Sequence, residues 1–150
     1  MILDLSRKEV VEFYCEELMS SVLLDSGAFI SVFTRTEDSL KSKFNNVINT
    51  GCKTIVGGFG GNGNIVPVYI IPKLSIGSIT IFNLPVAVYS NNNITADLIL
   101  SSYVFKNNEF TVNFKNRILE VRERDIHCLL IKEGNLVTKF TVFAQEEIQP

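Results

Sequence analysis

One acidic residue interrupts a hydrophobic stretch in the first third of the chain. Asp25 follows the apolar run Val22–Leu24, Ser26 and Gly27 come next, and a second apolar run begins at Ala28. An isolated carboxylate in apolar surroundings is costly unless it is paired or neutralised. Ser and Gly both favour a tight turn, and Gly adopts positive φ without steric cost. We therefore expect a carboxylate at the tip of a buried strand, held by a short loop and available for chemistry.

A glycine-rich segment is the second candidate. Gly58-Phe59-Gly60-Gly61-Asn62-Gly63 matches the dinucleotide-binding pattern G-x-G-x-x-G. That pattern works only where a helix opens at the loop, because the helix N-terminal amides hold the pyrophosphate. Here strand-forming residues and Pro67 follow, and no acidic residue stands about 20 positions further on. The segment therefore predicts the pliant tip of a β-hairpin rather than a nucleotide site.

The remaining reactive side chains form no motif. His127 is the only histidine and has no partner at metal-ligand spacing. Cys15, Cys52 and Cys128 are scattered and give neither a disulfide framework nor a zinc pattern. We predict no metal and no cofactor, and a reducing cytoplasm as the location.

Composition restricts the class of protein. The chain has 150 residues, 46% hydrophobic and 20% charged, with a net charge of -2, as in an ordinary single soluble domain. It has no cluster of Lys and Arg, which argues against nucleic acid as a partner. No apolar run approaches the length of a membrane span, and the N-terminus lacks the pattern of a signal peptide. The 11 Phe and 9 Gly favour strands and turns.

Most of the chain alternates in the manner of β-strands. Residues 10–24 predict a hairpin whose second strand ends at Asp25, although Ser6 could also cap a helix over the same residues. The elements expected further on are a short helix over 36–44, a hairpin of 54–56 with 65–71, a hairpin of 78–82 with 84–89, a buried run over 96–100, a helical turn over 101–105, strands at 110–114 and 118–121, and a final hairpin about 133–135. Pro67 predicts an edge or solvent-facing position in its strand.

In this order the chain resembles the retropepsin-like aspartic proteases, the single-domain relatives of pepsin of retroviral and bacterial type. The resemblance rests on Leu23-Leu24-Asp25-Ser26-Gly27-Ala28, on the glycine-rich hairpin, and on the stretch Asp97 to Phe105. It implies a mostly β fold, a closed pepsin-like barrel with a flap hairpin and one or two short helices. It covers about residues 9–121 of a single domain 1–150, and leaves 122–150 as a C-terminal β extension without an assigned role.

The resemblance also implies roles for single residues. Asp25 would be catalytic, Ser26, Gly27 and Ala28 would support the active-site loop, and Gly58, Phe59, Gly60 and Gly61 would form the flap over the substrate. One position departs from the family, which usually has Gly after the apolar residues of the third motif. This chain has Ser101 there.

The chemistry needs two carboxylates around one water. Two such groups in contact cannot both ionise and share one proton, as in the aspartic-protease dyad that serves as a general example. The chain has a single Asp-Ser-Gly, since Asp38-Ser39 is followed by Leu40. The active site would therefore exist only in a homodimer, with one Asp25 from each subunit and an extended polypeptide as substrate.

Two functions follow from this pattern. The first is an aspartic endopeptidase that hydrolyses peptide bonds. The second is a non-catalytic dimerisation or peptide-binding module on the same fold, which Ser101 keeps open because fold does not determine activity.

Overall fold

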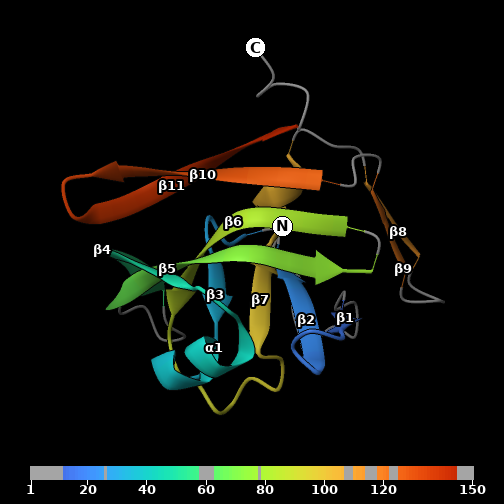
Figure 1. Cartoon of the computed structure of the whole chain (residues 1–150), viewed down its shortest axis with the longest axis horizontal. Helices are drawn as coiled ribbons and strands as arrows, with labels where there is room; N and C mark the ends of the chain where they lie inside the picture. The colour runs from blue at the N-terminus through green and yellow to red at the C-terminus, as the bar shows by residue number, and fades with distance from the viewer. Residues whose placement is uncertain are drawn as a thin grey trace.

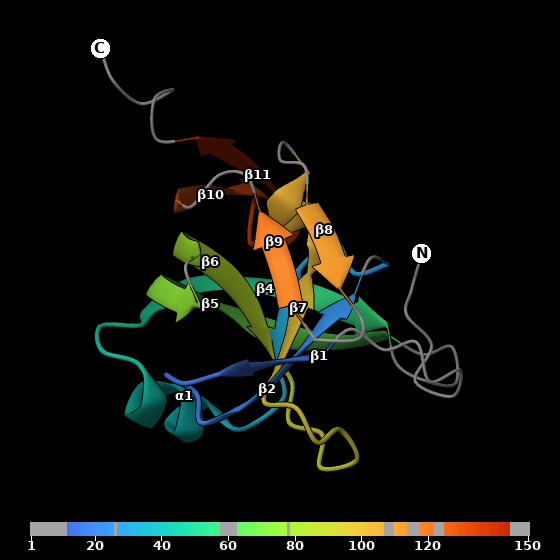
Figure 2. The same ribbon diagram turned by 90° about the vertical axis from the view of Figure 1, so that its right-hand side faces the viewer.

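A computed structural model describes residues 12–25, 27–57, 63–77, 79–106, 110–113, 118–121 and 125–144. This part of the chain is mostly β, as predicted, and its main sheet contains nine strands in mixed orientation (Figure 1). Their order across the sheet is β1-β2-β7-β3-β6-β10-β11-β4-β5. Their bounds are β1 Glu12–Cys15, β2 Ser20–Asp25, β3 Ser31–Phe33, β4 Ile48–Gly57, β5 Gly63–Ile76, β6 Ile79–Val88, β7 Leu98–Ser101, β10 Asp125–Glu133 and β11 Leu136–Ala144. Strands β8 (Phe110–Asn113) and β9 (Ile118–Val121) form a separate two-stranded sheet (Figure 2).

Two short helices join these strands. The helix α1 (Glu37–Lys43) begins after Thr36, whose Oγ1 accepts a hydrogen bond from the Ser39 N–H at 3.1 Å. Acidic residues in its first turn and lysines in its last turn interact favourably with the helix dipole and so stabilise the helix. The 3-10 helix η2 (Ser102–Phe105) follows β7 directly. Both confirm the helix and the helical turn predicted from the sequence.

The N-terminal segment forms the predicted hairpin. Strands β1 and β2 pair antiparallel, with Cys15 opposite Ser20. The alternative of a helix is wrong for the described residues 12–25, because β1 and β2 pair as strands and the hairpin buries Cys15, Val22 and Leu24 in the core.

Strand β7 is inserted between two strands that are consecutive in sequence. It pairs parallel with β2 on one side, where Asp25 lies opposite Ser101, and antiparallel with β3 on the other. The loop that joins β2 to β3 therefore passes over the end of β7. This crossing places the Asp25 loop against the beginning of η2.

The long hairpin of β4 and β5 forms as predicted, with Ile55 opposite Ile65 near its tip. Pro67 pairs with Lys53 of β4, and the pairing of β5 with β6 begins only at Val68. The missing N–H of Pro67 therefore interrupts no pairing with β6, in line with the predicted edge character.

The predicted hairpin of 78–82 with 84–89 is wrong. Residues 79–88 form one continuous strand, β6, which pairs with β5 across the tight turn at Gly77. Asn83 adopts φ +57 inside β6, a left-handed conformation that Asn tolerates better than most residues. The strand therefore bends there without ending.

The C-terminal hairpin turns at Gly134 (φ +61) and confirms the hairpin predicted about 133–135. Strand β10 pairs parallel with β6, while β11 reaches β4 through one pair, Leu136 with Lys53. Strands β4, β5, β6, β10 and β11 thus form a circuit of pairings, because β5 also pairs with β6. With so slight a β11–β4 connection the sheet is not a clear barrel.

The interior consists of two apolar clusters. The larger one joins the inner faces of nearly all main-sheet strands with Leu40 of α1 and Phe105 of η2. The smaller one contains Ile30, Val32, Cys52, Val66, Val68, Ala87 and Val137. Burying each large aliphatic or aromatic side chain contributes about 1.5–3 kcal/mol, so the clusters hold the crossing of β2, β7 and β3 in place.

Candidate functional site

Asp25 lies at the end of β2, where the sequence predicts a carboxylate. Leu23 and Leu24 before it are buried, whereas Asp25 itself is half-buried. Its Oδ1 accepts a hydrogen bond from the Gly27 N–H at 2.8 Å, which closes a turn of the Asx type. The carboxylate is therefore partly solvated in the single chain, and the turn fixes the direction in which the loop leaves it.

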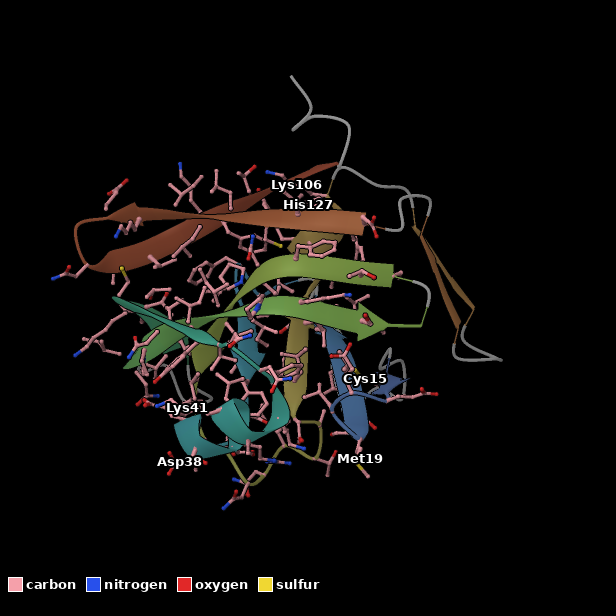
Figure 3. The ribbon with its side chains drawn as sticks, viewed as in Figure 1. Cys15, Met19, Asp38, Lys41, Lys106 and His127 are labelled. Carbon is pink, nitrogen blue, oxygen red and sulfur yellow. The ribbon has the colours of Figure 1, made fainter. Side chains whose placement is uncertain are left out.

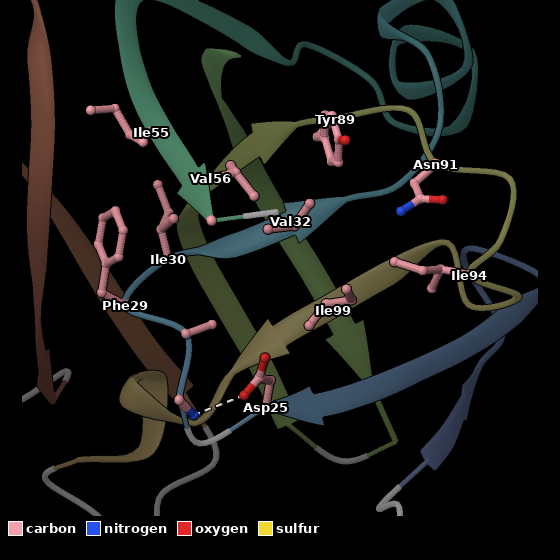
Figure 4. Close-up of a pocket in the computed structure, with 13 residues that line it drawn as sticks. Asp25, Phe29, Ile30, Val32, Ile55, Val56, Tyr89, Asn91, Ile94 and Ile99 are labelled. Atoms are coloured by element: carbon pink, nitrogen blue, oxygen red, sulfur yellow. Dashed lines mark hydrogen bonds between the residues drawn. The ribbon is translucent and has the colours of Figure 1, made fainter. Parts of the chain in front are cut away.

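An apolar cleft of about 300 Å³ opens beside Asp25 (Figure 4). Its lining comes from the loop after β2, from β3, from the end of β4, from the segment after β6 and from β7. The lining residues are Asp25, Gly27, Ala28, Phe29, Ile30, Val32, Ile55, Val56, Gly57, Tyr89, Asn91, Ile94 and Ile99. Among these described residues Asp25 is the only one with a charged side chain. The cleft can thus hold an apolar group next to a single carboxylate.

The β4–β5 hairpin supplies one wall of the cleft. Ile55, Val56 and Gly57 at the end of β4 line it. Asn64 at the start of β5 donates from Nδ2 to the Oη of Tyr89, which also lines the cleft, at 3.5 Å. The predicted flap residues Gly58, Phe59, Gly60 and Gly61 lie outside the described residues, but β4, the strand that precedes them, borders the cleft. A strand, β5, follows this segment, as expected for a hairpin rather than a dinucleotide-binding loop.

The loop after Asp25 is tied to β7. Ser101 is fully buried and its Oγ donates to the Ala28 carbonyl oxygen at 2.5 Å. The Ser101 N–H donates to Ser31 Oγ at 3.0 Å, and its Oγ accepts from the Tyr103 N–H at 3.2 Å. Gly27 and Ala28 of this loop line the cleft, whereas Ser26 lies outside the described residues.

A second acid near the cleft is engaged elsewhere. Asp97 is 8% exposed and forms ion pairs with Arg35 at 2.9 Å and Lys43 at 3.2 Å. The Arg35 guanidinium also donates to the carbonyl oxygens of Asn91 and Ile94, at 3.2 and 2.9 Å. Asp97 therefore holds the segment after β6 in place and does not line the cleft.

The side chains set aside in the sequence have structural surroundings. The ring of His127 stacks on Phe82, with centroids 4.7 Å apart and an interplanar angle of 10°. The three cysteines are free and buried, and burial raises the pKa of the Cys128 thiol to about 12. Within the described ranges, no three His, Cys, Asp or Glu side chains gather into a group that could hold a metal ion.

Sequence reasoning missed part of the cleft. Tyr89, Asn91 and Ile94 were expected only as strand end and loop, yet they form its far wall. Their sequence carries no signal for this role, because it depends on the Arg35 and Asp97 pairing that folds their segment back. Arg35 itself stands alone in the sequence and belongs to no motif.

Comparison of the chain with protein-family models, with curated proteins and with solved structures finds no match. In the part of the chain that the structure describes, every helix is too short or too polar to cross a membrane.

Proposed function

We propose that the protein is a homodimeric aspartic endopeptidase of the retropepsin-like type. The observation that carries the proposal is the position of Asp25, a half-buried carboxylate at one end of an apolar cleft beside a long hairpin. A concave, mostly apolar cleft with very few polar groups is typical of a ligand-binding site. The Asx turn and the contacts of Ser101 support a fixed carboxylate position.

The pepsin-like barrel is part of the proposal. The insertion of β7 between β2 and β3 supports it, since it presents the Asp25 loop at the edge of the cleft. The circuit of β4, β5, β6, β10 and β11 supports a sheet that curves toward closure.

A single chain supplies one carboxylate to this cleft, and hydrolysis by this chemistry needs two. Asp97 is not available as the second, because Arg35 and Lys43 neutralise it. Two copies related by a two-fold axis would bring Asp25 of each together, and the pair would hold one proton. One member would then accept a proton from the attacking water while the other donates to the scissile carbonyl oxygen.

The substrate would be a polypeptide in extended conformation. The β4–β5 hairpin would cover it and exclude bulk water from the carboxylates. The aliphatic lining of the cleft, from Ile30, Val32 and Ile99, favours apolar side chains next to the scissile bond.

The test is Asp25→Asn in a peptide-library cleavage assay at mildly acidic pH. We expect cleavage to fall by about a hundredfold or more, because the acid–base pair is lost, with the melting temperature unchanged. Asp38→Asn is the matched control, since Asp38 also precedes a serine but is exposed on the outer side of α1 (Figure 3). Equal cleavage by wild type and Asp25→Asn, or a strictly monomeric mass in solution at the assay concentration, would contradict the proposal.

A second assay separates an enzyme from a peptide-binding module. A protease should bind a peptide mimic with a tetrahedral hydroxyl group at least about a hundredfold more tightly than the plain peptide, because the mimic resembles the transition state. Equal affinity for both ligands would favour the non-catalytic module.

A further inference from the structure

Ser101 stands where the resembled family usually has glycine, and its hydroxyl forms two hydrogen bonds. It is fully buried at the end of β7, opposite Asp25 in the parallel pairing of β2 and β7. A buried hydroxyl without partners would be costly, and this one both donates and accepts a hydrogen bond. Position and bonding together place it behind the Asp25 loop.

The contacts of Ser101 join three segments. Its Oγ donates to the carbonyl oxygen of Ala28, three residues after Asp25. The same oxygen accepts the Tyr103 N–H and so caps η2, while the Ser101 N–H donates to Ser31 Oγ at the start of β3. One residue of β7 therefore holds both the middle of the loop between β2 and β3 and the start of β3.

The loop has few other anchors among the described residues. Gly27 and Phe29 are exposed, and the N–H of Gly27 is bonded to Asp25 itself. The Asp25 carboxylate is hydrogen-bonded to the Gly27 amide, and Ala28 is the next residue in the chain. The bond from Ser101 to Ala28 therefore restrains both groups. A glycine at position 101 would leave the Ala28 carbonyl without this donor.

We propose that Ser101 is a positioning residue, which fixes the Asp25 carboxylate by holding the Ala28 carbonyl from behind the loop. It does not touch the cleft and acts only through the loop. The inference rests on the proposed function for its kinetic consequence, but its structural part is independent of any activity. Serine in place of glycine at position 101 therefore adds a hydrogen bond that orders the Asp25 loop, and it does not indicate lost catalysis.

The first measurement is amide exchange by NMR at Gly27, whose N–H reports the Asp25 turn directly. In Ser101→Ala we expect exchange at Gly27 to be about fivefold faster or more, because loss of a hydrogen bond costs about 1 kcal/mol. Ser101→Gly, which adds no bulk and suits the extended backbone at this position, is the second variant should the first fold poorly. Thr34→Val is the matched control, since it removes an equally buried hydroxyl that donates to a carbonyl, Ala96 O, at the other end of β7.

The second measurement is peptide cleavage. We expect kcat to fall about ten- to a hundredfold in Ser101→Ala with KM within about threefold, because a displaced catalytic group slows the chemical step more than it weakens binding. Thr34→Val should leave the kcat per folded molecule unchanged.

The outcomes separate the two proposals. Unchanged Gly27 exchange in both Ser101 variants, or a change of equal size in Thr34→Val, overturns the role of Ser101 whatever the activity. Absence of cleavage by the wild-type dimer overturns the proposed function, and the exchange experiment then decides the role of Ser101 by itself.

Discussion

At the scale of single residues, Asp97 is a nearly buried acid whose two carboxylate oxygens each pair with a cation. Arg35 and Lys43 each pair with one of its oxygens, and Arg35 extends the network to four backbone carbonyls, those of Thr34, Asn91, Ile94 and Thr95. Both cations are partly exposed, so solvent screens part of the attraction. The network links α1 to the end of β3 and to the segment after β6, and the last two of these border the cleft.

Replacement of Asp97 tests whether it is structural or catalytic. Asp97→Asn leaves two partly buried cations without their carboxylate, and we expect the free energy of unfolding to fall by roughly 2–4 kcal/mol. Urea unfolding measures this, with Asp38→Asn as the control expected to change by less than about 1 kcal/mol. Cleavage per folded molecule should be preserved. Loss of cleavage in a folded Asp97→Asn would instead assign Asp97 a part in the chemistry.

At the scale of elements, the β4–β5 hairpin combines a firm base with a lightly held end. Its base pairs with β6 along most of β5 and buries Val68, Tyr69 and Ile71. Toward the tip, Ile55 and Ile65 are 48% and 68% exposed, and the exposed Asn64–Tyr89 hydrogen bond connects β5 to the segment after β6. Such a distribution of contacts allows the end of the hairpin to open while the base stays in the sheet.

Removal of the Tyr89 hydroxyl tests this contact. Tyr89→Phe deletes the acceptor for Asn64, and we expect amide exchange at Asn64 and Ile65 to rise about two- to tenfold, as for the loss of one hydrogen bond. The melting temperature should stay within error, because the bond is exposed. Asn64→Ala should have the same effect, and the double variant should add nothing further. Additive effects of the two substitutions would show that the side chains do not act on each other.

Predictability differed among the elements according to how local their signal is. The turn after Asp25, the short helix that follows Thr36 and the hairpin turn at Gly134 depend on neighbouring residues, and the sequence predicted all three. The continuity of β6 was not, because Asn83 reads as a turn residue and its bend is stabilised only by pairing with β5. The far wall of the cleft and the place of β10 beside β6 depend on contacts between residues far apart in sequence, for which the local pattern holds no information.

At the scale of the whole molecule, the buried thiols make stability depend on pH. Burial raises the pKa of Cys128 to about 12 and also raises that of Cys15, whereas a thiol in the unfolded chain titrates near 8.5. The folded state therefore keeps protons that the unfolded state releases. This contribution is fully present below pH about 8.5 and is lost as the pH rises toward the folded-state values.

We expect the free energy of unfolding to fall by about 1.4 kcal/mol per pH unit above that point because of Cys128, with a further decrease from Cys15. Urea unfolding at a series of pH values from neutrality to about 10 measures the slope. Cys128→Ala should be less stable at neutral pH but should lose the share of the slope that belongs to this thiol. Identical slopes for the variant and the wild type would show that Cys128 ionises as readily in the folded protein as in the unfolded one.

The insertion of β7 between β2 and β3 also sets an order of events during synthesis. Strand β7 lies more than 70 residues after β2, so the two flanking strands leave the ribosome long before their middle neighbour exists. Until Ser101 has emerged, β2 lacks its pairing with β7 and the Ala28 carbonyl lacks its hydrogen bond. The wall of the cleft that β7 supplies is also absent. The Asp25 loop therefore acquires its hydrogen bonds to β7 only after about two thirds of the chain has been made, and the cleft beside it is completed after that point.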